Sequence, residues 1–278
     1  MMQVAWGTAT DRGRFRRINE DAHLAEPPVF LVSDGMGGHA AGEVAAAIVV
    51  DEFRSRAGQG DVESAWVTEC IVRAGRRIRD GVRGGATVVG AAVVSHSGDP
   101  YWLAFNIGDS RAYRCADGEL TQISVDHSYV QELVDAGELT RAEVRHHPQR
   151  NVITRAVGLA GDGDPDCWLI PGREGDRLLF CSDGLTGELD DDSIKDILVG
   201  HVDPQIAADE LIAAALKAGG RDNATAVVVD VLAVAAGADP ATTARRPERS
   251  EIESTRPRGR QDGRAGRTGG RHTSRESA

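Results

Sequence analysis

Short apolar runs and longer helical stripes alternate along the chain. Residues 29–32 form one apolar run, which stops at Ser33-Asp34-Gly35. A run of this length that ends in turn residues is typical of a buried strand. The same pattern predicts further strands at 2–8, 86–95, 101–107, 111–115, 119–123, 167–170, 177–181 and 224–233. We therefore expect a core built mainly from β-strands.

Apolar residues at three- and four-residue steps predict the helices. Three helix starts carry capping signals: Asp126, the capping box from Thr140 to Glu143, and Asp203 followed by Pro204. The predicted helices lie at 40–55, 62–82, 127–136, just after residue 140, 191–199 and 204–218.

The strands between residues 86 and 123 follow one another without an intervening helix. A turn cluster at 95–100 joins the first two, and Ala116-Asp117-Gly118 forms a hairpin turn between the last two. Tight connections join antiparallel neighbours, because parallel strands need a longer crossover. The elements predict an α+β fold with antiparallel sheet.

Charge divides the chain into two parts. Of the net charge of −11, residues 241–278 contribute +5 from ten arginines and five acids, so residues 1–240 carry −16. An acidic domain is a poor partner for nucleic acid, because phosphate neutralisation by Lys and Arg dominates that binding. From residue 236 onward Arg, Gly, Ser, Thr and Pro replace the apolar residues, which is typical of disorder. We predict an ordered domain at 1–235 and a disordered, Arg-rich tail at 236–278.

The cysteines and the apolar runs bear on location. Cys70, Cys115, Cys167 and Cys181 show no CxxC spacing, which argues against a zinc site and for a reducing compartment. No apolar run approaches the roughly 18 residues that a membrane span requires. We expect a cytoplasmic monomer with no membrane or nucleic-acid partner.

Four aspartates stand where a β run meets a glycine-containing turn. Asp34 and Asp183 each follow an apolar run within a Ser-Asp-Gly sequence, Asp109 follows Gly108, and Asp222 precedes the last strand. Each one alone is interpreted as a turn residue. Four together in an acidic domain favour a shared site for Mg²⁺ or Mn²⁺, which prefer hard oxygen ligands. Their spacing does not establish that they converge.

Two polar stretches accompany these aspartates. Gly35, Gly37 and Gly38 permit positive φ and let carbonyl oxygens approach a ligand closely. Residues 10–21 pack charges of both signs together. Taken alone, this second stretch is interpreted equally well as a solvated hairpin turn.

Eight motifs occur in the order typical of one enzyme family: TDRGRFRRINEDA, VSDGMGGHAAGEVAA, GATVVG, NIGDSRAY, DHSYVQELVDAG, HPQRNVITRAVG, CSDGLTG and GGRDNATAVVV. Over residues 3–232 the chain resembles the metal-dependent serine/threonine protein phosphatases (type 2C, PPM), most closely their bacterial branch. The resemblance implies a central β-sandwich of two antiparallel sheets flanked on both sides by helix pairs. The metal site is expected in a cleft at one end of the sandwich.

The resemblance implies that two Mn²⁺ or Mg²⁺ ions bind in this cleft. Asp34 bridges both ions, and Glu20 with the carbonyl oxygen of Gly35 serves one of them, while Asp183 and Asp222 hold the other. Two cations lower the pKa of a bridging water, which then attacks phosphorus in line. The expected reaction is hydrolysis of phosphoserine and phosphothreonine in proteins, opposing a bacterial Ser/Thr kinase.

The resemblance also implies supporting roles for other residues. Arg16 binds the phosphate oxygens, with Arg17 as the neighbouring alternative. Asp21 and Asn223 support the ligands. Because no phosphoenzyme forms, no nucleophilic side chain is expected, and we interpret three serines as packing or turn residues: Ser33, Ser110 and Ser182.

The sequence departs from many members of the family at two positions. Met36 stands where they carry a His that is a candidate acid for the leaving group, so a metal-bound water is the first choice and His39 the alternative. Asp109 resembles a ligand of a third metal ion, but Gly187 replaces an aspartate that supports it. The adjacent Glu188 is expected to point elsewhere. A third metal site is therefore expected to be weak.

The irregular stretch 126–166 matches the mobile flap of the family, beside the active site. In it, His146, His147 and Arg150 are candidate contacts for the substrate protein, or alternatively a solvated cluster. Two other functions stay open: a phosphatase specialised for one small regulator, and a catalytically silent module that binds phosphoproteins. The silent module is disfavoured, because the expected metal ligands are all present.

Overall fold

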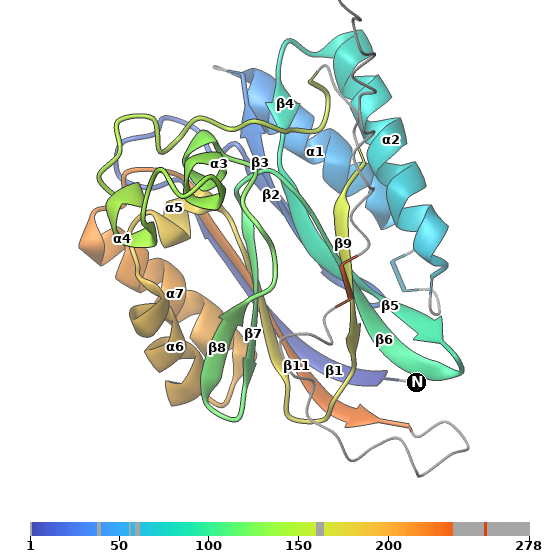
Figure 1. The fold of residues 1–278 in the computed structure, drawn as a ribbon. Coiled ribbons are helices and arrows are strands. Elements are labelled where there is room, and N and C mark those ends of the chain that lie inside the picture. Colours follow the sequence, from blue (N-terminus) through green and yellow to red (C-terminus); the bar gives the residue numbers. More distant parts are fainter. Residues whose placement is uncertain are drawn as a thin grey trace, which may run out of the picture.

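The computed structural model describes residues 2–37, 40–55, 57–58, 62–159, 164–235 and 253–254. Two antiparallel sheets lie at its centre (Figure 1). The first sheet has the order β1-β11-β10-β7-β8, that is Met2–Asp11, Ala224–Val234, Arg177–Cys181, Arg111–Ala116 and Glu119–Gln122. The second has the order β12-β9-β6-β5-β3-β2, that is Glu253–Ser254, Asp166–Pro171, Asp99–Ile107, Val88–His96, Val29–Met36 and Asp21–Glu26; β4 (Gly85–Ala86) also pairs with β3.

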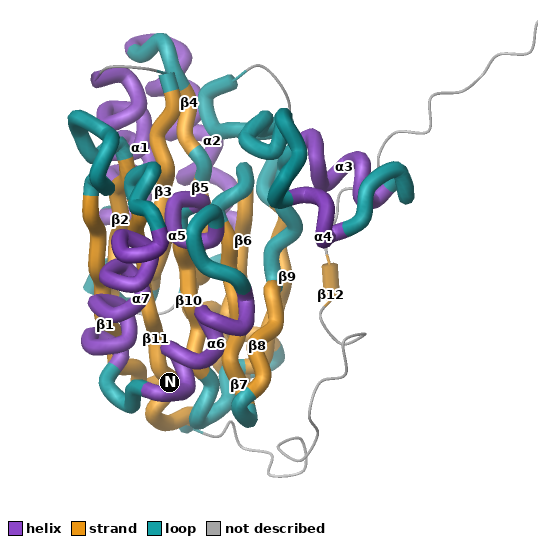
Figure 2. The backbone as a smooth tube through the Cα atoms, turned by 90° about the vertical axis from the view of Figure 1, so that its left-hand side faces the viewer, coloured by secondary structure: helices purple, strands orange, loops and turns teal. Residues whose placement is uncertain are grey.

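Helices cover the outer face of each sheet. α1 (Ala40–Arg54) and α2 (Ser64–Gly81) pack on the second sheet. α6 (Asp191–Gly200) and α7 (Pro204–Ala218) pack on the first sheet, in front of β1, β10 and β11 in Figure 2. The remaining helices are short: α3 (Tyr129–Asp135), α4 (Arg141–Val144) and α5 (Asp183–Thr186). The predicted β-sandwich flanked by helix pairs is confirmed.

The central strands are buried on both faces, which explains their uninterrupted apolar runs. In β3, Phe30 and Val32 pack between the sheets, whereas Val29 and Leu31 pack under α1 and α2. Successive side chains leave a strand on opposite faces, so one run supplies two cores. The molecule therefore has three apolar layers, one between the sheets and one under each helix pair.

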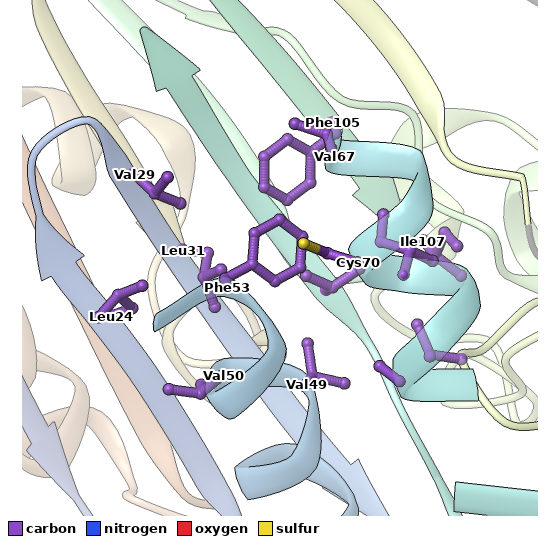
Figure 3. Close-up of a cluster of buried hydrophobic side chains, with 14 of the residues drawn as sticks. Leu24, Val29, Leu31, Val49, Val50, Phe53, Val67, Cys70, Phe105 and Ile107 are labelled. Carbon is purple, nitrogen blue, oxygen red and sulfur yellow. The ribbon is translucent and has the colours of Figure 1, made fainter. Parts of the chain in front are cut away.

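Stacked aromatic rings join α1 to the second sheet. Phe53 of α1 and Phe105 of β6 have ring centroids 5.3 Å apart and planes inclined by 7°. Figure 3 shows both rings near Cys70 of α2, and all three side chains are fully buried. Truncating such a phenylalanine to alanine costs about 3–5 kcal/mol, so this contact contributes strongly to holding the helix pair on the sheet.

Two predicted caps are confirmed at single-residue detail. Asp203 Oδ1 accepts hydrogen bonds from the backbone N–H groups of Gln205 and Ile206 at the start of α7. The N–H of Thr140 donates to the Glu143 carboxylate at 2.9 Å, as the capping box requires.

The cap predicted at Asp126 is wrong. α3 begins at Tyr129, and Ser128 is its N-cap. Asp126 instead accepts a forked pair of hydrogen bonds from Arg111, from Nε to Oδ1 at 3.0 Å and from Nη2 to Oδ2 at 2.6 Å. A forked Arg–carboxylate pair makes two hydrogen bonds with charge on both partners, whereas a cap bond to a backbone N–H has charge only on the carboxylate. Asp126 therefore binds the arginine, and the helix starts two residues later than predicted.

Several short elements were not predicted. β2 has the sequence DAHLAE, in which only Leu24 is fully buried, so it carries no apolar run. β4 and β12 have two residues each.

The tail predicted at 236–278 lies outside the described residues except for β12, which pairs with Trp168 and Leu169 of β9. Within the described ranges, no helix combines the length and the apolar character needed to cross a membrane.

Candidate active site

The predicted carboxylates lie at one end of the two sheets. The chain crosses from the first sheet to the second at residues 12–20 and returns at 108–110. The ladder partners align the strand ends: Asp11 pairs with Ala224, and Cys181 pairs with both Ala226 and Arg111. This edge of the sandwich therefore collects the two crossing segments together with Asp183, just after β10, and Asp222, just before β11.

Asp34 lies at the centre of a carboxylate group. It faces Asp21 directly in the β2–β3 ladder, and the carboxylate of Asp183 lies close enough to act on its charge. Burial is the main cause that raises the pKa of Asp34 well above its usual range, and the charges of Asp21, Asp183, Asp109 and Asp222 add to it. The two Ser-Asp-Gly strand ends therefore meet, which their spacing in the sequence could not establish.

Several oxygens of this group have no hydrogen-bond partner. Among the described residues, Glu20 Oε1, Asp21 Oδ1 and Asp109 Oδ1 are buried and unpaired. Burial, followed by the charge of Asp183, raises the pKa of Asp109 well above its usual range. Because a buried carboxylate is costly unless it is paired or bound to a metal, the group is chemically incomplete without cations.

Two hydroxyl groups hold Asp21. Its Oδ2 accepts hydrogen bonds from Ser182 Oγ and Thr225 Oγ1, each at 2.7 Å. Burial outweighs these bonds and raises the pKa of Asp21 to about 7. Ser182 is therefore more than the packing or turn residue inferred from the sequence, since it joins the first sheet to a carboxylate of the second.

Thr87 links three parts of the site, and sequence reasoning missed it. Its Oγ1 accepts the N–H of Asp34 at 3.0 Å and lies 2.7 Å from Ser110 Oγ, while its carbonyl oxygen accepts from Ser33 Oγ at 2.7 Å. The available signal was a polar residue within the small, apolar run GATVVG. Ser33 and Ser110 therefore also do more than pack, because they tie the end of β3 to the turn that carries Asp109.

Asn223 fixes the segment that crosses from the first sheet to the second. Its Oδ1 accepts the N–H of Glu20 at 2.9 Å. Its Nδ2 donates to the carbonyl oxygens of Arg12 at 2.8 Å and Ile18 at 2.9 Å. One buried amide thus sets the position of the backbone on both sides of Arg16.

Arg16 lies next to Asp222. Its Nη2 is 2.5 Å from Asp222 Oδ2, and its side chain is 48% exposed. Burial lowers the pKa of Arg16, but the hydrogen bond and charge of Asp222 outweigh it, so the pKa is raised. A permanent cation therefore stands at the solvent side of the carboxylates, where an anion can reach it.

Close packing of glycines brings the first turn of α1 against β3. A Cβ at Gly35 would lie 2.0 Å from the carbonyl oxygen of Gly42, and a Cβ at Gly42 would lie 2.4 Å from Glu20 Oε1. Gly37 has a positive φ, at 148°. Gly35 does not use this freedom, because it continues strand β3, and Gly38 lies outside the described residues.

The sequence profile of the family described as protein phosphatase 2C matches residues 16–233. The chain belongs to the protein phosphatase 2C family. The serine/threonine protein phosphatase PstP of Mycobacterium tuberculosis is 38% identical over 241 residues, which cover 82% of this chain and 45% of that protein. The serine/threonine phosphatase stp of Listeria welshimeri is 33% identical over 238 residues, covering 80% of this chain and 93% of that protein.

A solved structure of the family has the same fold. The catalytic domain of the serine/threonine protein phosphatase PstP, in complex with two manganese ions, gives a TM-score of 0.72 at 33% identity. The match covers 83% of this chain and 99% of that chain. This chain nevertheless spans about half the length of the complete M. tuberculosis relative.

The two positions expected to differ from the family pattern, Met36 and Gly187, have distinct surroundings. His39, the alternative acid, lies outside the described residues, and Met36 is half-buried. Glu188, next to Gly187, points away from the carboxylate group as expected. Its carboxylate accepts from Arg221, with Nη2 at 2.8 Å and the backbone N–H at 2.9 Å.

The stretch expected to form the flap of a 2C-type phosphatase docks beside α5. Arg145 donates to the carbonyl oxygen of Leu189 at 2.5 Å. Of the candidate substrate contacts, His146 and Arg150 are exposed, and His147 Nδ1 accepts from the N–H of Gln149 at 3.2 Å. In the described part of the chain, none of these three side chains makes a hydrogen bond or an ion pair with the carboxylate group.

The donor set of this protein phosphatase 2C site fits Mg²⁺ or Mn²⁺. Within the described residues, no three His, Cys, Asp or Glu side chains converge tightly enough to hold an ion by themselves. Mg²⁺ commonly keeps several waters and takes one or two carboxylates, so an open arrangement of oxygens suits it. The unpaired buried oxygens of Glu20 and Asp109 supply such hard ligands.

Proposed function

We propose that this protein is a metal-dependent phosphatase that hydrolyses phosphoserine and phosphothreonine in other proteins. The observation that carries the proposal is the buried carboxylate group around Asp34, with unpaired oxygens on Glu20, Asp21 and Asp109. The relatives named serine/threonine protein phosphatases support it.

Two Mn²⁺ or Mg²⁺ ions are the proposed cofactor, as in the relative solved with two manganese ions. Asp34 would contact both, Glu20 and the carbonyl oxygen of Gly35 would serve one, and Asp183 and Asp222 the other. Activation of the attacking water and neutralisation of the phosphoryl charge are the chemistry that such a pair supplies. A third ion at Asp109 would bind weakly.

Residues of the chain orient the reaction. Arg16 exchanges Asp222 for the substrate and forks onto two phosphate oxygens as negative charge develops. Asp21, held by Ser182 and Thr225, keeps the end of β2 against the ligands of β3. Candidate contacts to the substrate protein are the flap residues His146, His147 and Arg150.

Release of phosphate from a phosphothreonine peptide by the full chain tests this function. We expect turnover with Mn²⁺, loss of turnover with EDTA, and loss in Asp34→Ala, whereas the exposed control Asp80→Ala keeps it. Binding of the peptide without release of phosphate would instead establish a binding module. Turnover confined to one small regulatory protein would establish the specialised phosphatase.

The wider setting is also part of the proposal. The protein opposes a bacterial Ser/Thr kinase in the cytoplasm, acts as a monomer, and holds its whole catalytic unit within residues 1–235. Light scattering tests the monomer, and truncation after Pro240 tests the catalytic unit. Unchanged activity of the truncated chain at low and high salt is expected.

A further inference from the structure

The segment Arg12–Ile18, which we call the arginine loop, has a firmly held backbone. The N–H of Arg14 donates to the carbonyl oxygen of Gly220 at 2.8 Å. Asn223 Nδ2 holds the carbonyl oxygens at both ends of the loop. Gly13 has a φ of 75°, and a Cβ there would lie 2.2 Å from the carbonyl oxygen of Asp222. The loop is therefore fixed in one conformation directly beside the candidate metal ligand Asp222.

Several side chains of this loop are exposed to solvent. Phe15 is 72% exposed, and Arg14 and Arg17 are exposed as well. In the part of the chain that the structure describes, neither Arg14 nor Arg17 takes part in an ion pair. The stem of Arg14 passes over the turn before β11, since its Cγ would lie 3.2 Å from a Cβ at Gly220.

The arginine loop is positively charged, whereas the domain that carries it is strongly negative. Four of its seven residues are arginines and none is acidic, although residues 1–240 carry −16. Phe15 is only slightly buried, at 72% exposure, so it contributes little hydrophobic stabilisation. A rigid backbone that displays unpaired cations and a bare aromatic ring is arranged to bind something outside the chain.

We propose that the arginine loop selects substrates by the residues next to the phosphorylated one, favouring acidic peptides that also carry an apolar side chain. Arg14 and Arg17 would pair with carboxylates, and Phe15 would pack on the apolar group. This rests on the proposed phosphatase function. The chain's own tail is a poor ligand for the arginine loop. Residues 241–278 carry +5, so the positively charged loop would repel them.

The position of Arg16 links the loop to the reaction. Arg16 lies between Phe15 and Arg17, and its guanidinium reaches Asp222. A phosphate bound by Arg16 would therefore bring the flanking residues of its peptide within reach of Arg14, Phe15 and Arg17. Small phosphate esters, which have no flanks, would miss these contacts.

Three substrates test the proposal with the full chain: p-nitrophenyl phosphate and two phosphothreonine peptides, with acidic or with glutamine flanks. The quantity measured is kcat/KM for the acidic peptide divided by kcat/KM for p-nitrophenyl phosphate. We expect this ratio to fall about tenfold in the double variant Arg14→Gln, Phe15→Ala, mainly through KM, as the loss of about 1.4 kcal/mol of binding would produce. The control Arg76→Gln, an exposed arginine of α2, should leave the ratio within about twofold of wild type.

The outcomes separate the two proposals. A preference for the acidic peptide that weakens at high salt supports the arginine loop as the selecting element. Parallel losses on all three substrates in the double variant, or equal losses on both peptides, overturn it while leaving the phosphatase intact. A wild-type protein that hydrolyses none of the three overturns the proposed function itself.

Discussion

Asp21 and Asp34 face each other as paired residues of β2 and β3. Like charges directly opposite each other destabilise a sheet. Burial raises the pKa of both carboxyl groups, to about 7 for Asp21. This pair therefore favours a bound cation, and it makes the stability of the fold depend on metal and on pH.

Removal of divalent metal should destabilise the protein more at high pH than at low pH. A carboxyl group with a raised folded pKa favours the fold below its unfolded pKa of about 3.9. That contribution is lost as the pH rises through the folded value, about 7 for Asp21. The rise in Tm on adding Mn²⁺ should therefore be several degrees larger at about pH 8 than at about pH 5.

Thermal unfolding with Mn²⁺ or with EDTA measures this difference. Equal rises in Tm at both pH values would show that groups other than a metal already neutralise the charge of these carboxylates.

Replacement of Asn223 by alanine should damage catalysis more than stability. The variant loses the amide that positions the backbone around Arg16 and Glu20. Misplacement of reacting groups by about 1 Å costs roughly 100-fold in rate, and we expect a loss of that order in kcat/KM for p-nitrophenyl phosphate. The matched control is Asn151→Ala, at an exposed position. Wild-type kinetics in Asn223→Ala would contradict the positioning role.

Asp166 should stabilise the fold at neutral pH and lose this effect in acid. Burial opposes its charge, but hydrogen bonds from His127 and Arg155 outweigh burial and lower the pKa of Asp166 to about 2. Such a carboxylate stabilises the fold above its unfolded pKa, and the effect disappears as the pH falls through the folded value. Asp166→Asn should therefore cost about 2 kcal/mol at neutral pH.

Urea unfolding of Asp166→Asn and wild type at several pH values checks this. The difference in free energy of unfolding should shrink between about pH 5 and pH 2.5, whereas the exposed control Asp80→Asn should show little difference throughout. A pH-independent difference would mean that Asp166 acts by packing and not by charge.

Replacement of Thr87 by valine should destabilise the protein although the shape of the side chain is kept. The methyl group cannot accept the N–H of Asp34 or bond to Ser110 Oγ, and the site is fully buried. Leaving buried polar groups unpaired costs about 1–3 kcal/mol. Urea unfolding measures the loss, with Thr121→Val at an exposed position of β8 as the control. No loss of stability relative to that control would show that the hydrogen bonds of Thr87 do not stabilise the site.

The fold could be predicted largely because the central strands are buried on both faces. β3, β10 and β11 supply side chains to two apolar layers each, so their sequences are continuous apolar runs. β2 could not be recognised in this way, because its residues other than Leu24 are only partly buried or exposed. Its strand structure depends on pairing with β3, which local sequence does not encode.

The positions of the carboxylates could be predicted, but their polar partners could not. Ser182 donates a hydrogen bond to Asp21, which lies 161 residues away in the sequence. Asp126 binds Arg111 and does not cap a helix. Such partners are set by tertiary contacts and not by neighbouring residues, so a local rule assigned Asp126 to a cap and Ser182 to packing. Thr87 was missed for the same reason.

Binding of Mn²⁺ to Asp34→Ala, measured by titration calorimetry of the full chain, tests the proposed metal site most directly. Wild-type protein should bind two ions, with a third one weakly. Because Asp34 is proposed to contact both of the two ions, the variant should lose both, while circular dichroism shows its fold intact. An Asp34→Ala protein that still binds two Mn²⁺ ions with wild-type affinity would contradict the proposed site.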